Sequence, residues 1–291
     1  MPIRLLLIEP HDSYLQISLI ERGAIYAHLA NIVKGLSIPV NSISSQHITD
    51  DKFIESTIKS HAKYAILSHK WLRGTPGEIT YDHWNKGLLD SESDGYQKLA
   101  GFCRSAWNDH GITLAWMDTI CINKDSGSEL DESIRSMYAW YERAEICIVY
   151  LSETKMIMDI EDDTWFTRGW TLQELLAPKA FKFYNCEWIQ LAQGPNDKEN
   201  SDILGIIQRK TTISHMELMN ITIIPFSRRM EWAARRKVTR EEDMAYSLMG
   251  IFNVSISIAY GEGADRAFRR LLEGIMKTAP SGAMDLFNWA G

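Results

Sequence analysis

Three short, continuous apolar runs alternate with segments of helical periodicity, and this alternation constrains the fold more than any other feature of the chain. The runs cover residues 64–67, 113–117 and 146–151, and residues 181–184 are expected to form a fourth strand. Strands buried on both faces, as in parallel sheets, have this composition. The segments between them, residues 95–110 and 128–143, carry apolar residues at helical spacing. The sequence therefore predicts an α/β fold with a parallel sheet flanked by helices.

Polar side chains follow these runs where the predicted strands end. Ser68 and His69 follow the first run, Asp118 the second and Ser152 the third. Ligands of open parallel sheets bind beyond the carboxyl ends of the strands, so we expect these side chains at one edge of the sheet.

The stretch 165–178 is dense in side chains that do chemistry. Its apolar positions Leu172, Leu175 and Leu176 predict a helix that packs inward and stops at Pro178. Trp170 and Glu174 stand four residues apart and therefore share a different face of that helix. With Arg168 just upstream, these residues are a candidate site for a cationic or sugar-phosphate ligand. The alternative is a surface glutamate on a helix whose tryptophans fill the core.

The ends of the chain are less clearly patterned. Residues 3–8 could form a strand, and residues 11–60 show only weak periodicity. Residues 128–131 and 239–242 resemble capping boxes at helix starts. The part after residue 196 is predicted to be mostly helical, with one helix over 264–278. We expect a first domain over 1–195 and a helical extension over 196–291 that packs on it.

Charge and cysteine usage exclude several classes of protein. A net charge of −7 makes nucleic acid an unlikely partner, and the basic run over 228–240 is interpreted as a solvated face balanced by neighbouring acids. The four cysteines form no CxxC pair, so we expect no metal site. Reduced thiols and the lack of a signal-like or membrane-spanning run favour a cytoplasmic protein without membrane contact.

Three blocks of the sequence resemble those of the fungal heterokaryon-incompatibility (HET) domain. They lie at residues 65–71, 115–123 and 168–175, in the same order and at similar spacing. Residues 239–243 and 260–263 look like the segment that follows this domain in many fungal proteins. The resemblance implies a role in programmed cell death after non-self recognition. It also implies that the domain is the N-terminal effector of a larger receptor with a nucleotide-binding domain.

HET domains are in turn similar to TIR domains, which have a flavodoxin-like parallel sheet. Ser68-His69-Lys70 is similar to the end of the first TIR strand, and Trp170 to Leu175 has the spacing of the TIR Trp-Cys-x-x-Glu-Leu helix, with Thr171 in place of Cys. The glutamate of that helix cleaves NAD in enzymatic TIR domains. The resemblance thus implies that Glu174 is catalytic and that NAD is the substrate, with no cofactor.

Cleavage of the nicotinamide–ribose bond suits a site with one carboxylate. The leaving group is already cationic, so no general acid is required, and a carboxylate can stabilise the oxocarbenium-like transition state. Trp170 or Trp71 could stack on the nicotinamide, and Lys70 or Arg168 could pair with the diphosphate. His69 and Asp118 could position ribose or water, or serve only as hydrogen-bond partners at the strand ends.

Two other functions stay open at this level. A non-catalytic TIR-like signalling module would assemble with itself, and Glu174 would then be an interface charge. A nuclease would use the basic run, but no cluster of carboxylates of the two-metal type stands out in the sequence. Because cell-death effectors must be silent until their receptor gathers them, we also expect activity to increase on self-association.

Overall fold

The computed structural model describes residues 1–35, 62–72, 74, 77–278 and 285. The strands of its sheet are β1 (Arg4–Pro10), β2 (Leu15–Glu21), β3 (Ala65–His69), β4 (Leu114–Trp116), β5 (Ile146–Tyr150) and β6 (Phe181–Tyr184). The helices around the sheet are α1 (Arg22–Gly35), α3 (Tyr81–Asn85), α4 (Asp94–Asn108), α5 (Asp118–Cys121), α6 (Gly127–Arg143) and α7 (Thr171–Leu176). The helices of the extension are α8 (Ser201–Thr211), α9 (His215–Met219), α10 (Phe226–Ala233), α11 (Asp243–Tyr246) and α12 (Ala264–Thr278).

The strand order is β2-β1-β4-β3-β5-β6. β4, β3, β5 and β6 are parallel to one another, whereas β1 runs antiparallel to both of its neighbours. The chain thus enters the parallel part at its centre, in β3, places β4 on one side and then returns to β5 and β6 on the other. This is the order of a flavodoxin-like sheet, and the α/β prediction is confirmed.

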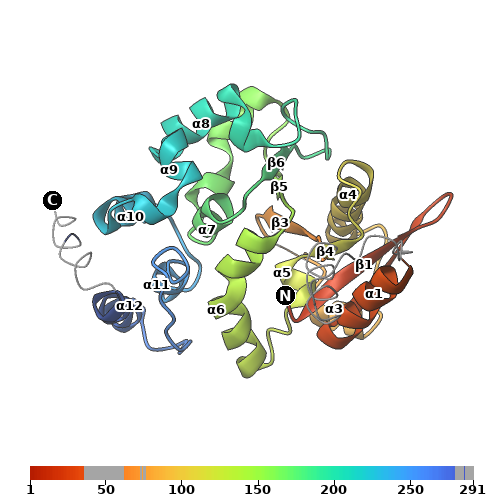
Figure 1. Cartoon of the computed structure of the whole chain (residues 1–291), viewed down its shortest axis with the longest axis horizontal. Coiled ribbons are helices and arrows are strands. Elements are labelled where there is room, and N and C mark those ends of the chain that lie inside the picture. The colour runs from red at the N-terminus through yellow and green to blue at the C-terminus, as the bar shows by residue number, and fades with distance from the viewer. Residues whose placement is uncertain (36–61, 73, 75–76, 279–284, 286–291) are drawn as a thin grey trace, which may run out of the picture.

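The helices cover both faces of this sheet, as Figure 1 shows: α6 and α7 lie on one side and α4 on the other. All five residues of β3 are buried, as the continuous apolar run predicted. The extension helices α10, α11 and α12 lie on the outer side of α6 and α7, so the extension adds a further layer beside the domain (Figure 1).

The N-terminal part holds more structure than its weak pattern indicated. The expected strand is β1, but it forms an antiparallel hairpin with β2, and α1 follows directly. Neither β2 nor α1 is predicted by the sequence, because β2 is half-buried along most of its length and does not alternate cleanly. Residues 36–60 of the weakly patterned stretch lie outside the described residues.

Three local predictions are corrected. Ser126 rather than Ser128 caps α6, since its hydroxyl accepts from the Glu129 N–H. No capping box forms at residues 239–242; the Glu242 carboxylate instead accepts from the backbone N–H groups of Gly261 and Gly263. The stretch 165–178 is not one helix: a 3-10 turn over Thr164–Thr167 precedes α7, and Arg168 between them is extended.

Candidate functional site

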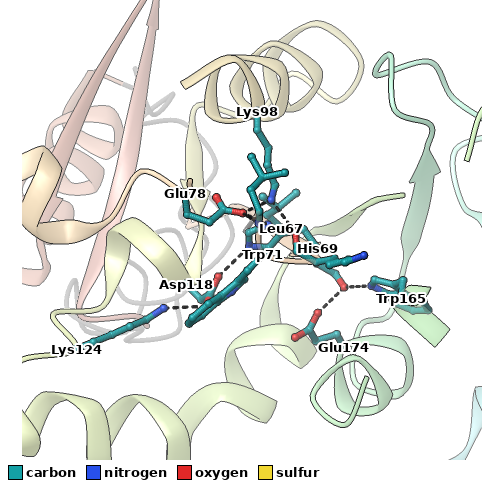
Figure 2. A network of polar contacts seen from close by, with 12 residues as sticks. Leu67, His69, Trp71, Glu78, Lys98, Asp118, Lys124, Trp165 and Glu174 are labelled. Carbon is teal, nitrogen blue, oxygen red and sulfur yellow. Dashed lines mark hydrogen bonds and ion pairs between the residues drawn. The ribbon is translucent and has the colours of Figure 1, made fainter. Parts of the chain in front are cut away.

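The ends of β3 and β4 bring three of the predicted residues together. Ser68 and His69 end β3, and Asp118 begins α5 just after β4, its parallel neighbour. His69 Nε2 lies 2.9 Å from Asp118 Oδ1, so the ring donates to the carboxylate (Figure 2). Three of the four expected strand-end side chains therefore gather at the carboxyl ends of neighbouring parallel strands.

Glu174 reaches the same place from α7. The Ser68 hydroxyl donates to Glu174 Oε2 at 2.5 Å, and the Trp165 indole N–H donates to the Ser68 oxygen at 2.7 Å (Figure 2). All three side chains are buried, and Glu174 is only 7% exposed. The chain Trp165–Ser68–Glu174 thus fixes the carboxyl group in one orientation, and the alternative of a surface glutamate is wrong.

The surroundings of Glu174 make its negative charge costly. Burial raises the pKa of Glu174 to about 7, with the charge of Asp118 adding to the effect. The hydrogen bond from Ser68 and the positive charges of His69 and Arg168 act in the opposite direction. Near neutral pH the carboxyl group therefore exchanges between its protonated and ionised forms, as expected of a group that takes part in acid–base or charge-stabilising chemistry.

A second cluster surrounds Asp118. Its Oδ2 accepts from the Trp71 indole N–H at 3.0 Å and from Lys124 Nζ at 3.3 Å, and the Lys124 ammonium lies 3.5 Å from the centre of the Trp71 ring (Figure 2). Although burial opposes ionisation, Lys124 and the His69 hydrogen bond hold the pKa of Asp118 well below its usual range. Asp118 is therefore a permanent anion beside Glu174, whose pKa is much higher.

A buried ion pair supports the loop after β3. Lys98 Nζ bonds to the Glu78 carboxylate and donates to the Lys70 carbonyl at 2.8 Å, while Glu78 Oε1 accepts from the Leu72 N–H at 2.8 Å. Glu78 Oε1 also lies 3.5 Å from His69 Nδ1. The pair thus holds the backbone that carries His69 and Trp71. Sequence reasoning missed it, and the only signal was a lysine beside Leu99 on the apolar face of a predicted helix.

These groups surround a cavity of about 300 Å³. Four parts of the chain form its walls. They are the ends of β3 and β4 together with the loop after β4, helix α6, the segment leading into α7 with α7 itself, and the extension. The lining includes His69, Trp71, Asp118, Lys124, Leu130, Ile134, Met137, Tyr141, Arg168, Gly169, Trp170, Glu174, Lys237, Val238, Thr239, Arg240, Asp243 and Tyr260. The volume and the mixture of apolar walls with a few polar groups are typical of small-molecule sites.

Six of the eight residues proposed from sequence line this cavity: His69, Trp71, Asp118, Arg168, Trp170 and Glu174. Ser68 lies behind Glu174 and orients it. Lys70 is not brought to the cavity, because its ammonium pairs with Glu153. Ser152, at the end of β5, does not line it either.

The extension supplies a wall that sequence reasoning did not assign to the site. Lys237 and Val238 line the cavity, as do Thr239, Arg240, Asp243 and Tyr260. The last four belong to the two blocks noted near the C-terminus, which pack on each other: the Tyr260 hydroxyl donates to Asp243 Oδ1 at 2.9 Å. The resemblance of these blocks to the segment after a HET domain was the signal that could have placed them here.

The basic run over 228–240 is not a simple solvated face. Arg229 is buried and donates to the backbone carbonyls of Ile224 and Ile251. The Arg236 guanidinium donates to the Arg168 carbonyl at 2.9 Å and to the Thr171 hydroxyl at 3.0 Å. Arg236 therefore joins the extension to the start of α7, and Thr171, the departure from the TIR pattern, accepts one of its bonds.

The described part of the chain also bears on metal binding, membrane crossing and disulfide formation. It contains no group of three or more His, Cys, Asp or Glu side chains arranged to hold a metal ion. None of its helices combines the length and the apolar character needed to cross a bilayer. All four cysteines are free thiols, and Cys103, Cys121 and Cys147 are buried.

The fold and the cavity define a class: a flavodoxin-like α/β protein with a buried, orientated glutamate beyond the carboxyl ends of its parallel strands. Residues 64–157 match the family model described as heterokaryon incompatibility protein (HET). The chain therefore carries a HET domain, as its three sequence blocks predicted.

The chain is also similar to a named protein, over a longer stretch than the family model covers. The chain is 39% identical over 227 residues to the vegetative incompatibility protein HET-E-1 of Podospora anserina, an alignment that covers 74% of this chain. The aligned part is 16% of the length of HET-E-1, so the chain is similar to only a small part of that protein. No solved structure matches the chain.

Proposed function

We propose that this chain is a cell-death effector of the incompatibility type and that it cleaves the nicotinamide–ribose bond of NAD. The observation that carries the proposal is Glu174: a carboxyl group buried at the wall of a cavity, held by Ser68, with a pKa raised to about 7. The HET domain and the similarity to HET-E-1 support the cell-death role. The similarity of HET domains to TIR domains supports NAD as the substrate.

The reaction needs little beyond this carboxylate. The bond between ribose C1′ and the nicotinamide nitrogen breaks, its electron pair leaves with the nitrogen, and nicotinamide departs as a neutral molecule. The ionised Glu174 stabilises the positive charge that develops on the ribose. Water then adds to C1′ and loses a proton, for which the Glu174 carboxylate is the acceptor. A carboxyl with a pKa near 7 is suited to that acceptor role.

Aromatic and polar residues of the cavity fit the rest of this substrate. Trp170, one turn before Glu174, and Trp71, 42% exposed at the same cavity, offer faces for the cationic nicotinamide ring. The Asp118 carboxylate, orientated by His69, can accept a further hydrogen bond from a ribose hydroxyl or from water.

The non-catalytic assembly module is the second candidate. It requires Glu174 to act as an interface charge, and a side chain that is 7% exposed and bonded to Ser68 offers little to a partner surface. The nuclease remains last, because the carboxyl groups of the described residues form no cluster that could hold a metal ion.

One experiment separates these functions. The purified chain is incubated with NAD and nicotinamide release is measured over a wide range of protein concentration. We expect release whose rate per molecule increases with concentration, because effector domains are active when their receptor gathers them. No release at any concentration, or on fusion to an oligomerising partner, would favour the assembly module. Release that is proportional to protein throughout would retain the enzyme and remove the dependence on self-association.

A further inference from the structure

One side of the cavity carries positive charge that the protein does not neutralise. Arg168, Lys237 and Arg240 all line it. Among the described residues, no carboxylate oxygen lies within 4.0 Å of any of these three side chains. The Arg168 Nε is buried and makes no hydrogen bond there. Cations gathered at a cavity without protein partners favour an anionic ligand, the more so in a chain of net charge −7.

The acids of the cavity are occupied by other groups. Asp118 accepts from His69, Trp71 and Lys124, and Asp243 accepts from Tyr260. Glu174 accepts from Ser68. Lys124 is thus the lysine paired with Asp118, whereas Glu174 and Asp243 act on Arg168 and Arg240 only through space and form no ion pair with them.

The backbone fixes two of these cations side by side. Arg168 and Lys237 are partners in a parallel β-bridge, in which the Lys237 N–H donates to the Thr167 carbonyl at 2.7 Å and the Gly169 N–H donates to the Lys237 carbonyl at 2.8 Å. Side chains of directly paired residues project to the same side. Arg240 follows three residues later and is held by its guanidinium, which lies 4.1 Å from the centre of the Tyr260 ring.

We propose that Arg168, Lys237 and Arg240 bind the diphosphate of the dinucleotide, so that the extension forms part of the substrate site. This inference rests on the proposed function, since it assigns the anionic half of the same substrate. The two guanidinium groups can each give paired N–H bonds to phosphate oxygens, and the ammonium adds a point charge. Lys70, the other residue expected at the diphosphate, is bound to Glu153 outside the cavity.

The proposal is tested by the binding of ADP-ribose, which keeps the diphosphate and lacks the nicotinamide. Calorimetric titration compares the wild-type chain with the double variant Lys237→Gln/Arg240→Gln. We expect the double variant to bind ADP-ribose at least about ten-fold more weakly, because two charge-assisted contacts are lost. Arg235→Gln is the matched control, since Arg235 is exposed in the same segment and does not line this cavity. Equal affinity in the wild-type chain and the double variant would overturn the proposal.

A second measurement separates this site from the fold and from the chemistry. Nicotinamide riboside has the bond to be cleaved but no phosphate, so the double variant should cleave it at the wild-type rate while its KM for NAD increases about ten-fold or more. An equal loss for both substrates would contradict a diphosphate role. If the double variant has a lower melting temperature than the wild-type chain, the single variant Lys237→Gln is used for the same comparison of substrates, because the Lys237 side chain is exposed. If the wild-type chain releases no nicotinamide, the proposed function fails, while the ADP-ribose titration still decides the anion site.

Discussion

The Glu174 side chain is almost fully buried, and its carboxyl group accepts a hydrogen bond from the Ser68 hydroxyl. The Ser68 oxygen in turn accepts a hydrogen bond from the Trp165 indole N–H. Orientation by Ser68 reduces the reorganisation needed when charge develops on the substrate. Burial supplies the raised pKa. The two effects together define what this residue can do, and each leads to a measurement.

The first prediction concerns the pH dependence of turnover. Because the ionised form of Glu174 is the one that stabilises an oxocarbenium, kcat/KM for NAD should increase as pH rises through about 7 and then level off. Ser68→Ala removes a hydrogen bond that favours the ionised form, so the midpoint should move to higher pH. A pH–rate profile for both proteins checks this. A midpoint near the ordinary glutamate value of about 4.5, unmoved by Ser68→Ala, would assign the rate to another group.

The raised pKa of Glu174 also predicts how the free energy of unfolding depends on pH, whether or not the protein is an enzyme. Between about 4.5 and about 7 the folded protein keeps a proton on Glu174 that the unfolded chain has lost. This group's contribution to the free energy of unfolding therefore decreases as pH rises through that window, by on the order of 3 kcal/mol. Glu174→Gln should remove this decrease, so the variant should gain stability relative to wild type at pH 8 but not at pH 4. Parallel denaturant titrations at both pH values provide the comparison.

Trp170 carries the second prediction at this scale. It lines the cavity one turn before Glu174 and is half-buried against the core. If its indole stacks on the nicotinamide ring, Trp170→Phe should reduce turnover modestly and Trp170→Ala by about ten-fold or more. If it serves only as core, Trp170→Ala should cost about 3–5 kcal/mol of unfolding free energy. Melting curves and turnover of both variants distinguish the roles, and unchanged activity per folded molecule in Trp170→Ala would end the stacking role.

At the scale of elements, the contact between the extension and the start of α7 passes through Gly169. A Cβ at this position would lie 2.5 Å from Val238 Cγ1, and the Gly169 N–H already bonds to the Lys237 carbonyl. Only a residue without a side chain lets the two segments pair at this distance. The pairing carries Arg168 and Lys237 to the cavity, so this close approach is part of the site's construction.

Gly169→Ala should therefore destabilise the protein by about 1–3 kcal/mol, the usual cost of overpacking. Shortening the neighbour in Gly169→Ala/Val238→Ala should recover much of that loss in a denaturant titration. Gly127→Ala is the control, because a Cβ at the first residue of α6 meets nothing within 4 Å. A full-stability Gly169→Ala variant would show that the segments are not held as closely as described.

The elements also show what a sequence can and cannot predict. The parallel strands were predicted because burial on both faces leaves a continuous apolar run, as at β3 and β5. The hairpin partner β2 was not, because a half-buried edge strand leaves a broken pattern. The strand order and the antiparallel β1 are set by packing between distant segments, which no local pattern encodes.

Some features of the candidate site could likewise be predicted from local sequence, and others could not. Glu174, Trp170 and the strand-end residues were predicted because helical spacing and the strand ends are local features. The bond between Ser68 and Glu174 joins residues 106 apart in the chain, and its partner Trp165 was read only as part of a helix. The wall made by residues 237–240, Asp243 and Tyr260 and the bond from Arg236 to Thr171 depend on tertiary packing of the extension.

For the whole molecule, the HET domain and the extension act as one structure around the cavity. The domain provides Glu174, its supporting hydroxyl and the anion Asp118, while the extension provides Lys237, Arg240 and the pairing that closes the wall. Removing the extension would open the cavity and expose Glu174 to water.

The central claim is that Glu174 cleaves NAD, and nicotinamide release by Glu174→Gln tests it most directly. The amide keeps the shape and can still accept from Ser68, but it lacks the charge that meets the oxocarbenium. Glu161→Gln is the matched control, because Glu161 is partly exposed, pairs with Arg209 and does not line the cavity. We expect release at the wild-type rate from Glu161→Gln and none above background from Glu174→Gln, with a cooperative melting transition for both and no loss of stability in Glu174→Gln. Near-normal release from a folded Glu174→Gln variant would contradict it.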